Sequence, residues 1–164
     1  MGSGKTSVGR LVADQLHFDF LDTDEVIESR AGRSISDIFA ENGELAFREL
    51  ERQLVEELAA RTHMVVSTGG GLPLDPANLA SLAQHALVVC LWVSPEKCWE
   101  RVRNQSHRPL IKDPDPLGKI RALLETRDKF YRQADVLVNT EWRSIREVAQ
   151  QVTYHFHAAR AEHK

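Results

Sequence analysis

The sequence lacks the features that mark secreted, membrane-bound or nucleic-acid-binding proteins. It has only two cysteines in 164 residues, and no apolar run approaches the roughly 20 residues that a membrane-spanning helix needs. Two cysteines without a signal peptide are typical of a reducing cytosol. The formal net charge is −3, whereas a nucleic-acid-binding domain usually carries a basic stripe. We therefore expect a cytoplasmic protein with no membrane segment and no nucleic-acid partner.

The sequence also lacks a histidine or cysteine pattern typical of a metal site. The seven histidines form no ligand cluster, and Cys90 lies in the apolar run "ALVVCLWV", where we expect a buried thiol. Apolar residues make up 42% of the chain and charged residues 27%, which are ordinary values for a globular protein. The composition predicts one domain over residues 1–164 and no histidine-based metal site. We also expect a monomer.

Short apolar runs alternate with helical patterns along the chain. Four strands are expected, over 18–22, 64–68, 86–93 and 135–140. Helices are expected between them, over 7–16, 23–32, 34–43, 44–61, 77–85, 95–104, 119–134 and 144–160. Thr23 is the expected N-cap of the second helix and Gly32 its end. The alternation predicts an α/β layer fold with a parallel sheet flanked by helices.

The stretch "GSGKTS" at residues 2–7 matches the end of the phosphate-binding pattern G-x-x-x-x-G-K-[ST]. The first glycine of that pattern would stand before residue 1. Small residues let backbone N–H groups surround a phosphate, and the following helix adds its positive N-terminus. Lys5 would reach the β- and γ-phosphates, and Thr6 would bind Mg²⁺. The alternative is a glycine-rich turn with a chance lysine.

Two aspartates follow the first expected strand in "LDTDE". Asp22 and Asp24 then lie at the carboxyl edge of the parallel sheet, where α/β proteins bind ligands. One of the two could orient a substrate hydroxyl while the other supports a metal through water. The alternative role, helix capping, is common for aspartate at such a place.

Three further features fit a site that binds an anionic substrate. Arg48 and Glu51 are three residues apart in "FRELE" and share a helix face, although for a lone Arg/Glu pair a surface ion pair is the better explanation. The glycines of "STGGG", residues 69–71, allow a ligand to approach the backbone closely, or else form a turn. Arg108 lies in the polar stretch 105–118, which we expect to be an exposed lid. Arg108 could close over phosphates and stabilise their charge. Arg127 lies in the next expected helix, and both arginines could equally be solvated.

In combination these stretches resemble the shikimate kinases, small P-loop kinases related to the nucleoside monophosphate kinases. The segments "GSGKTSVGR", "LDTDEVIE", "GRSISDIFAENGE", "FR", "STGGG", "RPL" and "TRDKFY" follow the order and spacing of that family over nearly the whole chain. The resemblance implies a three-layer P-loop kinase fold, with a lid at about 105–118 and substrate-binding helices at about 23–61. It implies transfer of the γ-phosphate of MgATP to the 3-hydroxyl of shikimate.

The resemblance also implies a role for each matching residue. Lys5, Asp24 and Arg108 would be catalytic, and Thr6 with Asp22, the latter through water, would hold Mg²⁺. ATP would be bound by Gly2, Ser3, Gly4, Lys5, Thr6, Ser7, Arg101 and Arg108, with Arg101 beside the adenine. Shikimate would be bound by Asp24, Arg48, Glu51, Gly69, Gly70, Gly71 and Arg127, with the two arginines on its carboxylate.

The chain departs from the family pattern at its N-terminus. The family begins with an apolar strand that enters a complete P-loop at the centre of a five-stranded sheet, and this chain supplies the other four strands. We expect the natural protein to be longer than 164 residues and this chain to be only marginally stable. Two alternatives remain: a related small-molecule kinase such as gluconate kinase, and a nucleotide-binding remnant without activity.

Overall fold

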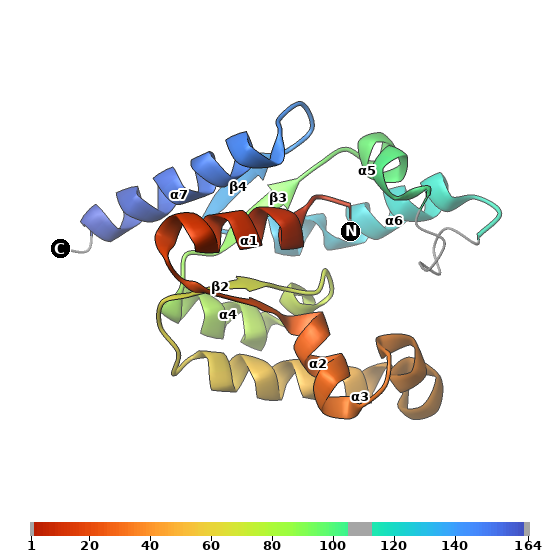
Figure 1. Ribbon diagram of the computed structural model, residues 1–164. Helices are drawn as coiled ribbons and strands as arrows, with labels where there is room; N and C mark the ends of the chain where they lie inside the picture. Colours follow the sequence, from red (N-terminus) through yellow and green to blue (C-terminus); the bar gives the residue numbers. More distant parts are fainter. Residues whose placement is uncertain (1, 105–112, 163–164) are drawn as a thin grey trace. The chain divides into compact units, whose positions relative to one another are not determined.

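The computed structural model describes residues 2–104 and 113–162 of the chain. The described chain alternates helices and strands (Figure 1). It divides into two compact units, residues 6–87 and residues 1–5 together with 88–164. Each unit is described in turn.

All four expected strands and all the expected helical regions are present. The first half of the chain contains α1 (Lys5–Leu16), β1 (Asp19–Asp22), α2 (Thr23–Ala31), α3 (Ile35–Leu58), β2 (Met64–Ser67), the 3₁₀ turn η1 (Leu72–Leu74) and α4 (Pro76–His85). The second half contains β3 (Val89–Trp92), α5 (Pro95–Val102), α6 (Pro116–Tyr131), β4 (Val136–Asn139) and α7 (Ile145–Glu162). The predicted α/β fold with parallel strands and flanking helices is confirmed.

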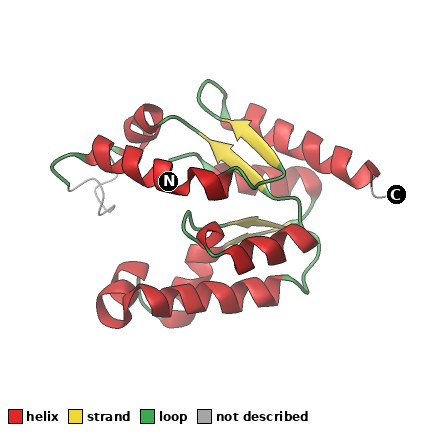
Figure 2. Ribbon diagram, turned by 180° about the vertical axis from the view of Figure 1, so that it is seen from behind, coloured by secondary structure: helices red, strands yellow, loops and turns green. Residues whose placement is uncertain are grey.

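The strands form two parallel pairs, β1 with β2 and β3 with β4 (Figure 2). In the first pair Asp22 is opposite Ser67, so both strands end at the same level. The carboxyl ends of parallel strands meet at one edge, and the residues that follow them are therefore brought together. Here these residues are the remainder of "DTD" after β1 and the three glycines after β2.

The core of the 6–87 unit forms between α2 and α3. Its buried apolar residues are Ile27, Ile38, Phe47, Leu54 and Leu58. Helix α3 begins after Ser34, whose hydroxyl accepts from Asp37 N–H. At Gly43 the backbone leaves the helix, with φ 79° and ψ 173°, so α3 consists of two helical segments as the sequence predicted. Such a φ favours glycine, and it starts the second segment at Glu44.

The core of the other unit forms between α5 and α6. Val93, Cys98, Val102 and Ile120 are buried there. Helix α6 begins at Pro116 rather than at residue 119, because Pro116 fits the first helical turn and Asp115 caps it by accepting from Gly118 N–H. The last three residues of the expected lid are therefore helical, and residues 105–112 lie outside the described residues.

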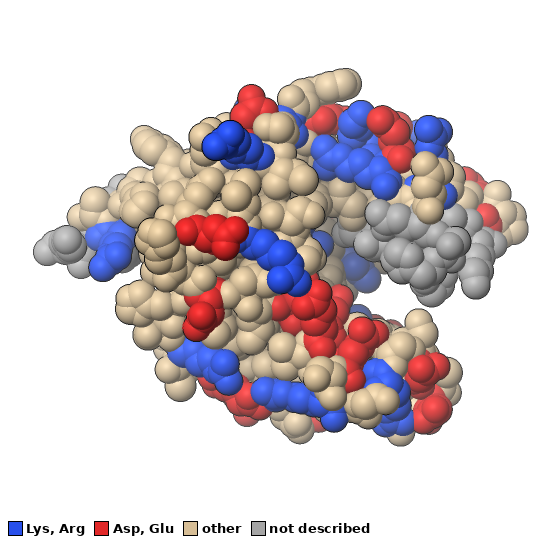
Figure 3. All heavy atoms as spheres, viewed as in Figure 1, with Lys and Arg blue, Asp and Glu red and all other residues tan. Residues whose placement is uncertain are grey.

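Three expectations drawn from the composition concern Cys90, the distribution of charge and membrane-spanning helices. Cys90 is half-buried rather than buried, as are its neighbours Val89 and Leu91 in β3, and burial raises the pKa of its thiol. Acidic and basic side chains are interspersed over the face shown in Figure 3. No helix within the described ranges is long and apolar enough to cross a membrane.

Candidate functional site

Thr6 and Asp22 are joined directly. The Thr6 hydroxyl, in the first turn of α1, donates to Oδ2 of Asp22 over 2.9 Å. Oδ1 of Asp22 accepts from Asp24 N–H over 3.1 Å and caps α2. The prediction of Thr23 as N-cap was wrong, because Asp22 at the end of β1 already supplies an oxygen to the amide two residues on, and Thr23 becomes the first helical residue.

This pair of oxygens has the chemistry that Mg²⁺ requires. Mg²⁺ is usually held by one or two carboxylates together with substrate phosphates, and a hydroxyl is an acceptable further ligand. No cluster of three or more His, Cys, Asp or Glu residues that could hold a metal occurs within residues 2–104 and 113–162. An ion held by Asp22 and Thr6 alone would need further ligands.

Thr23 connects the two strand ends. Its side chain is fully buried, and its hydroxyl oxygen accepts from the backbone N–H of Gly69 over 3.0 Å. Gly69 in turn lies against Asp24, since a Cβ atom at position 69 would be 2.5 Å from Oδ1 of that carboxylate. Sequence analysis missed the role of Thr23, although its place inside "DTD" at the end of a strand was an available clue.

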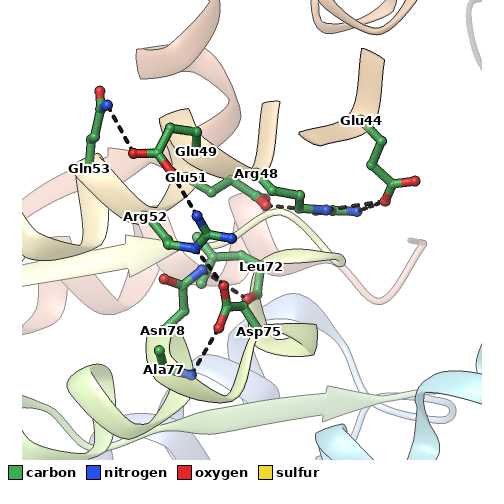
Figure 4. A network of polar contacts seen from close by, with 10 residues as sticks. All are labelled: Glu44, Arg48, Glu49, Glu51, Arg52, Gln53, Leu72, Asp75, Ala77 and Asn78. Carbon is green, nitrogen blue, oxygen red and sulfur yellow. Dashed lines mark hydrogen bonds and ion pairs between the residues drawn. The ribbon is translucent and has the colours of Figure 1, made fainter. Parts of the chain in front are cut away.

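Arg48 is held between two carboxylates on its own helix (Figure 4). Its Nη1 donates to Oε2 of Glu51 over 2.6 Å, while its Nη2 and Nε donate to Oε1 of Glu44 over 2.7 and 3.2 Å. Burial of Arg48 would lower the pKa of its guanidinium, but the hydrogen bonds to Glu51 and Glu44 outweigh it and raise the pKa. The Glu51 side chain is only 1% exposed, so its ion pair with Arg48 is not a surface pair.

Gly71 lies against the end of the Arg48 guanidinium. A Cβ atom at position 71 would be 2.5 Å from Nη1 and 2.7 Å from Nη2 of Arg48. The three-glycine segment therefore contacts a carboxylate at one end, through Gly69 and Asp24, and a guanidinium at the other. The glycines bring protein side chains as well as any ligand close to the backbone.

A second set of contacts fixes the chain beyond the glycines (Figure 4). Arg52 Nε donates to Oδ2 of Asp75 over 2.8 Å, and Oδ1 of Asp75 caps α4 by accepting from Ala77 N–H. The buried Asn78 side chain donates to the carbonyl oxygen of Leu72. These contacts hold η1 and the start of α4 to α3, so the glycine segment is anchored on both sides.

In the unit of residues 1–5 and 88–164, Arg101 connects two loops. Its Nη1 donates to the carbonyl oxygen of Gly2 over 3.2 Å and to Oγ1 of Thr140 over 3.0 Å, and its Nη2 donates to the carbonyl oxygen of Thr140 over 2.6 Å. Thr140 is buried and donates its N–H to Trp92. Arg101 therefore fixes the start of the glycine loop at Gly2 to the loop at Thr140.

The two other arginines predicted for the site are Arg127 and Arg108. Arg127 is half-buried in α6 and makes no hydrogen bond or ion pair with other residues of the described ranges, whereas its neighbours Arg121 and Arg132 pair with Glu96 and Asp128. Arg108, predicted as the lid arginine, lies outside the described residues.

A cavity of about 230 Å³ in the unit of residues 1–5 and 88–164 is lined by Trp92, Asp128, Tyr131, Arg132, Leu137 and Asn139. It contains no predicted site residue, so the candidate site rests on the side-chain contacts above.

A family model, related sequences and solved structures all identify the same family of proteins as similar to this chain. The model of the shikimate kinase family matches residues 1–156. Shikimate kinases of Symbiobacterium thermophilum and Caldanaerobacter subterraneus are 44% and 41% identical to the chain, and each match covers 93% of this chain and 89% of the relative. The structure of the Acinetobacter baumannii shikimate kinase in complex with shikimate is similar at a TM-score of 0.90 and 36% identity, covering 97% of this chain and 89% of that one.

Proposed function

This chain belongs to the shikimate kinase family of ATP-dependent small-molecule kinases, and we propose that it transfers the γ-phosphate of ATP to the 3-hydroxyl of shikimate. The products are shikimate 3-phosphate and ADP. The observation that carries the proposal is the glycine segment of the 6–87 unit, which contacts the Arg48 guanidinium at one end and the Asp24 carboxylate at the other. A substrate that bears both a carboxylate and hydroxyl groups requires this combination.

Arg48 binds the substrate carboxylate. A guanidinium offers pairs of parallel N–H donors that match the two oxygens of a carboxylate. Glu51 is buried and bonded to Nη1, so it fixes the plane of the guanidinium before substrate arrives. Arg127 is our candidate for a second guanidinium on the same carboxylate, a role that its lack of an ion pair with described residues supports.

Asp24 orients the attacking hydroxyl and accepts its proton. The carboxylate is held next to Gly69, and the backbone amide of Asp24 is fixed by Asp22. A positioned carboxylate base contributes by proton transfer and by alignment of the nucleophile. Gly70 and Gly71 offer backbone groups to the same substrate.

The phosphates of ATP are bound at the start of α1. Backbone groups of residues 2–7 surround them, and Lys5 neutralises charge on the transferring group. Thr6 and Asp22, whose side-chain oxygens are 2.9 Å apart, would hold Mg²⁺, Asp22 through water. When bound, the ion would neutralise part of the phosphate charge. Arg101, which donates a hydrogen bond to the carbonyl oxygen of Gly2, lies beside the adenine. Arg108 is our candidate for the arginine that covers the phosphates.

The remaining features of the proposal concern the state of the protein. We place it in the cytoplasm, which suits its two cysteine thiols. The small net charge and the interspersed surface charges fit small anionic substrates better than a polyanion. We also propose that the enzyme acts as a monomer.

A thermal-shift experiment with three ligands tests the assignment against its two alternatives. Shikimate and MgATP should each raise Tm, since a ligand that binds only the folded state stabilises it. Gluconate, an open-chain polyol carboxylate, should raise Tm less than shikimate at equal concentration. A larger shift with gluconate would favour a gluconate kinase, and no shift with any ligand would indicate an inactive remnant.

Substitution of the arginines tests the carboxylate site separately. Arg48→Ala and Arg127→Ala should each weaken shikimate binding by about 1.5–3 kcal/mol, the range for a hydrogen bond to a charged group. MgATP binding should change much less. Arg121→Ala, which removes an exposed pair with Glu96, is the matched control. Equal losses for both ligands would contradict the carboxylate role.

A further inference from the structure

Glu44 occupies the same donors on Arg48 that a ligand carboxylate would use. One oxygen of Glu44, Oε1, accepts from both Nε and Nη2, which together form one edge of the guanidinium. Nη1 is bonded to Glu51, and Gly71 lies against the terminal nitrogens. The Nε/Nη2 edge is a pair of neighbouring N–H groups of the kind that binds a carboxylate with two contacts.

We propose that Glu44 is an internal stand-in for the substrate carboxylate, and that shikimate must displace it from Arg48 to bind. The inference rests on the proposed function. It assigns to Glu44 a role in setting substrate affinity that differs from the role of Glu51, although both residues pair with the same arginine.

The burial of the two glutamates supports this division. The side chain of Glu51 is 1% exposed and that of Glu44 is 64% exposed, while the side chain of Arg48 is 18% exposed. A buried carboxylate cannot leave its partner without a large desolvation penalty. An exposed pair four residues apart on a helix is weak and can be exchanged, because water solvates the released carboxylate.

Charge requires that Glu44 leaves. Arg48 carries one positive charge and already contacts two carboxylates, so a third on the same guanidinium would add like-charge repulsion. Glu44 is the first residue after the non-helical Gly43, at the start of the second segment of α3. Its exposed side chain can turn into solvent without moving the helix that carries Arg48 and Glu51.

The test compares Glu44→Gln with wild type by calorimetry and steady-state kinetics. The glutamine keeps the size of the side chain but removes the charge that competes for Arg48. Kd and KM for shikimate should fall by about twofold to fivefold, the factor that corresponds to a weak exposed pair. The kcat and the KM for MgATP should stay unchanged. Glu49→Gln, which removes another exposed charge, paired with Arg52 on the same helix, should leave all these constants unchanged.

A second variant keeps the result interpretable. In an Arg48→Ala background, Glu44→Gln should give no tightening, because there is no guanidinium to compete for. A higher KM for shikimate in Glu44→Gln would overturn the inference and make Glu44 a residue that positions Arg48, and an unchanged KM would overturn it as well. If the wild type neither binds nor phosphorylates shikimate, the proposed function fails, and the inference fails with it.

Discussion

A Cβ atom on Gly69 would lie 2.5 Å from Oδ1 of Asp24. Position 69 therefore has no room for a side chain while the Asp24 carboxylate stays in its place. Thr23 keeps Gly69 and Asp24 there, because its buried hydroxyl accepts from Gly69 N–H. The end of β2 therefore determines where the proposed catalytic carboxylate lies. Three of the predictions below follow from this arrangement.

Gly69→Ala should displace the Asp24 carboxylate and lower kcat/KM for shikimate by at least about tenfold, equivalent to about 1.4 kcal/mol. The KM for MgATP should stay near the wild-type value. Gly32→Ala is the matched control, since it adds a methyl group where nothing lies within 4 Å and strains only a positive φ. The control should lose stability but keep its kinetic constants. Full activity in Gly69→Ala would show that this close approach has no catalytic importance.

Asp24→Asn should lower kcat by about 10²- to 10⁴-fold, the usual contribution of a general base. The amide keeps the shape of the side chain but cannot accept the proton of the hydroxyl. Glu25→Gln is the control, because Glu25 is the next residue and forms an exposed pair with Arg10. If Asp24→Asn reduced only Tm, Asp24 would be a structural residue at the start of α2.

Thr23→Val should lower the free energy of unfolding by about 1–3 kcal/mol, because the shape is kept while the buried Gly69 N–H loses its acceptor. Urea unfolding monitored by circular dichroism measures the change. Thr23→Ser keeps the hydroxyl and should lose less. A valine variant as stable as wild type would mean that the N–H finds another acceptor.

Acid should weaken the anchor formed by Asp75. The hydrogen bond from Arg52, together with that from Ala77 N–H, holds the pKa of this carboxyl below its usual value. Below about pH 4, the usual pKa of an aspartate, the unfolded chain binds a proton that the folded chain does not. The stabilisation is therefore present above that pH and is lost as the pH falls through the lowered pKa.

Asp75→Asn removes this pH dependence. The variant should be less stable than wild type at pH 7, and the difference in free energy of unfolding should shrink as the pH falls below about 4. Glu49→Gln breaks the other ion pair of Arg52 and should leave the acid dependence of the Asp75 contribution in place. A constant difference between wild type and Asp75→Asn over that range would contradict a lowered pKa.

Local patterns predicted the ends of helical segments well where a single residue has a clear preference. Gly43 interrupts α3 and Gly32 ends α2, both as the sequence indicated. The choice between Asp22 and Thr23 as N-cap failed because both residue types are good caps. It is decided by the end of β1, which pairing with β2 determines.

The contacts within the site were less accessible from sequence. The motifs singled out the candidate residues, whose roles stay predictions, but they did not predict the pairing of Arg48 with Glu44. Spacing allows Arg48 to reach Glu44 and Glu51 alike, and it does not say which carboxylate is buried. The approach of Gly69 to Asp24 and of Gly71 to Arg48 joins residues far apart in the chain, so it appears only when β1 and β2 are paired.

The most direct test of the central claim is the rate of ADP release by the purified protein with MgATP, with and without shikimate, together with the mass of the product. We predict that release depends on shikimate, that the product is shikimate with one added phosphoryl group, and that gluconate supports a much lower rate. Lys5→Met should lower kcat/KM by more than tenfold, or about 1.4 kcal/mol. ADP release that is independent of shikimate, or a Lys5→Met variant that keeps the wild-type rate, would contradict the account.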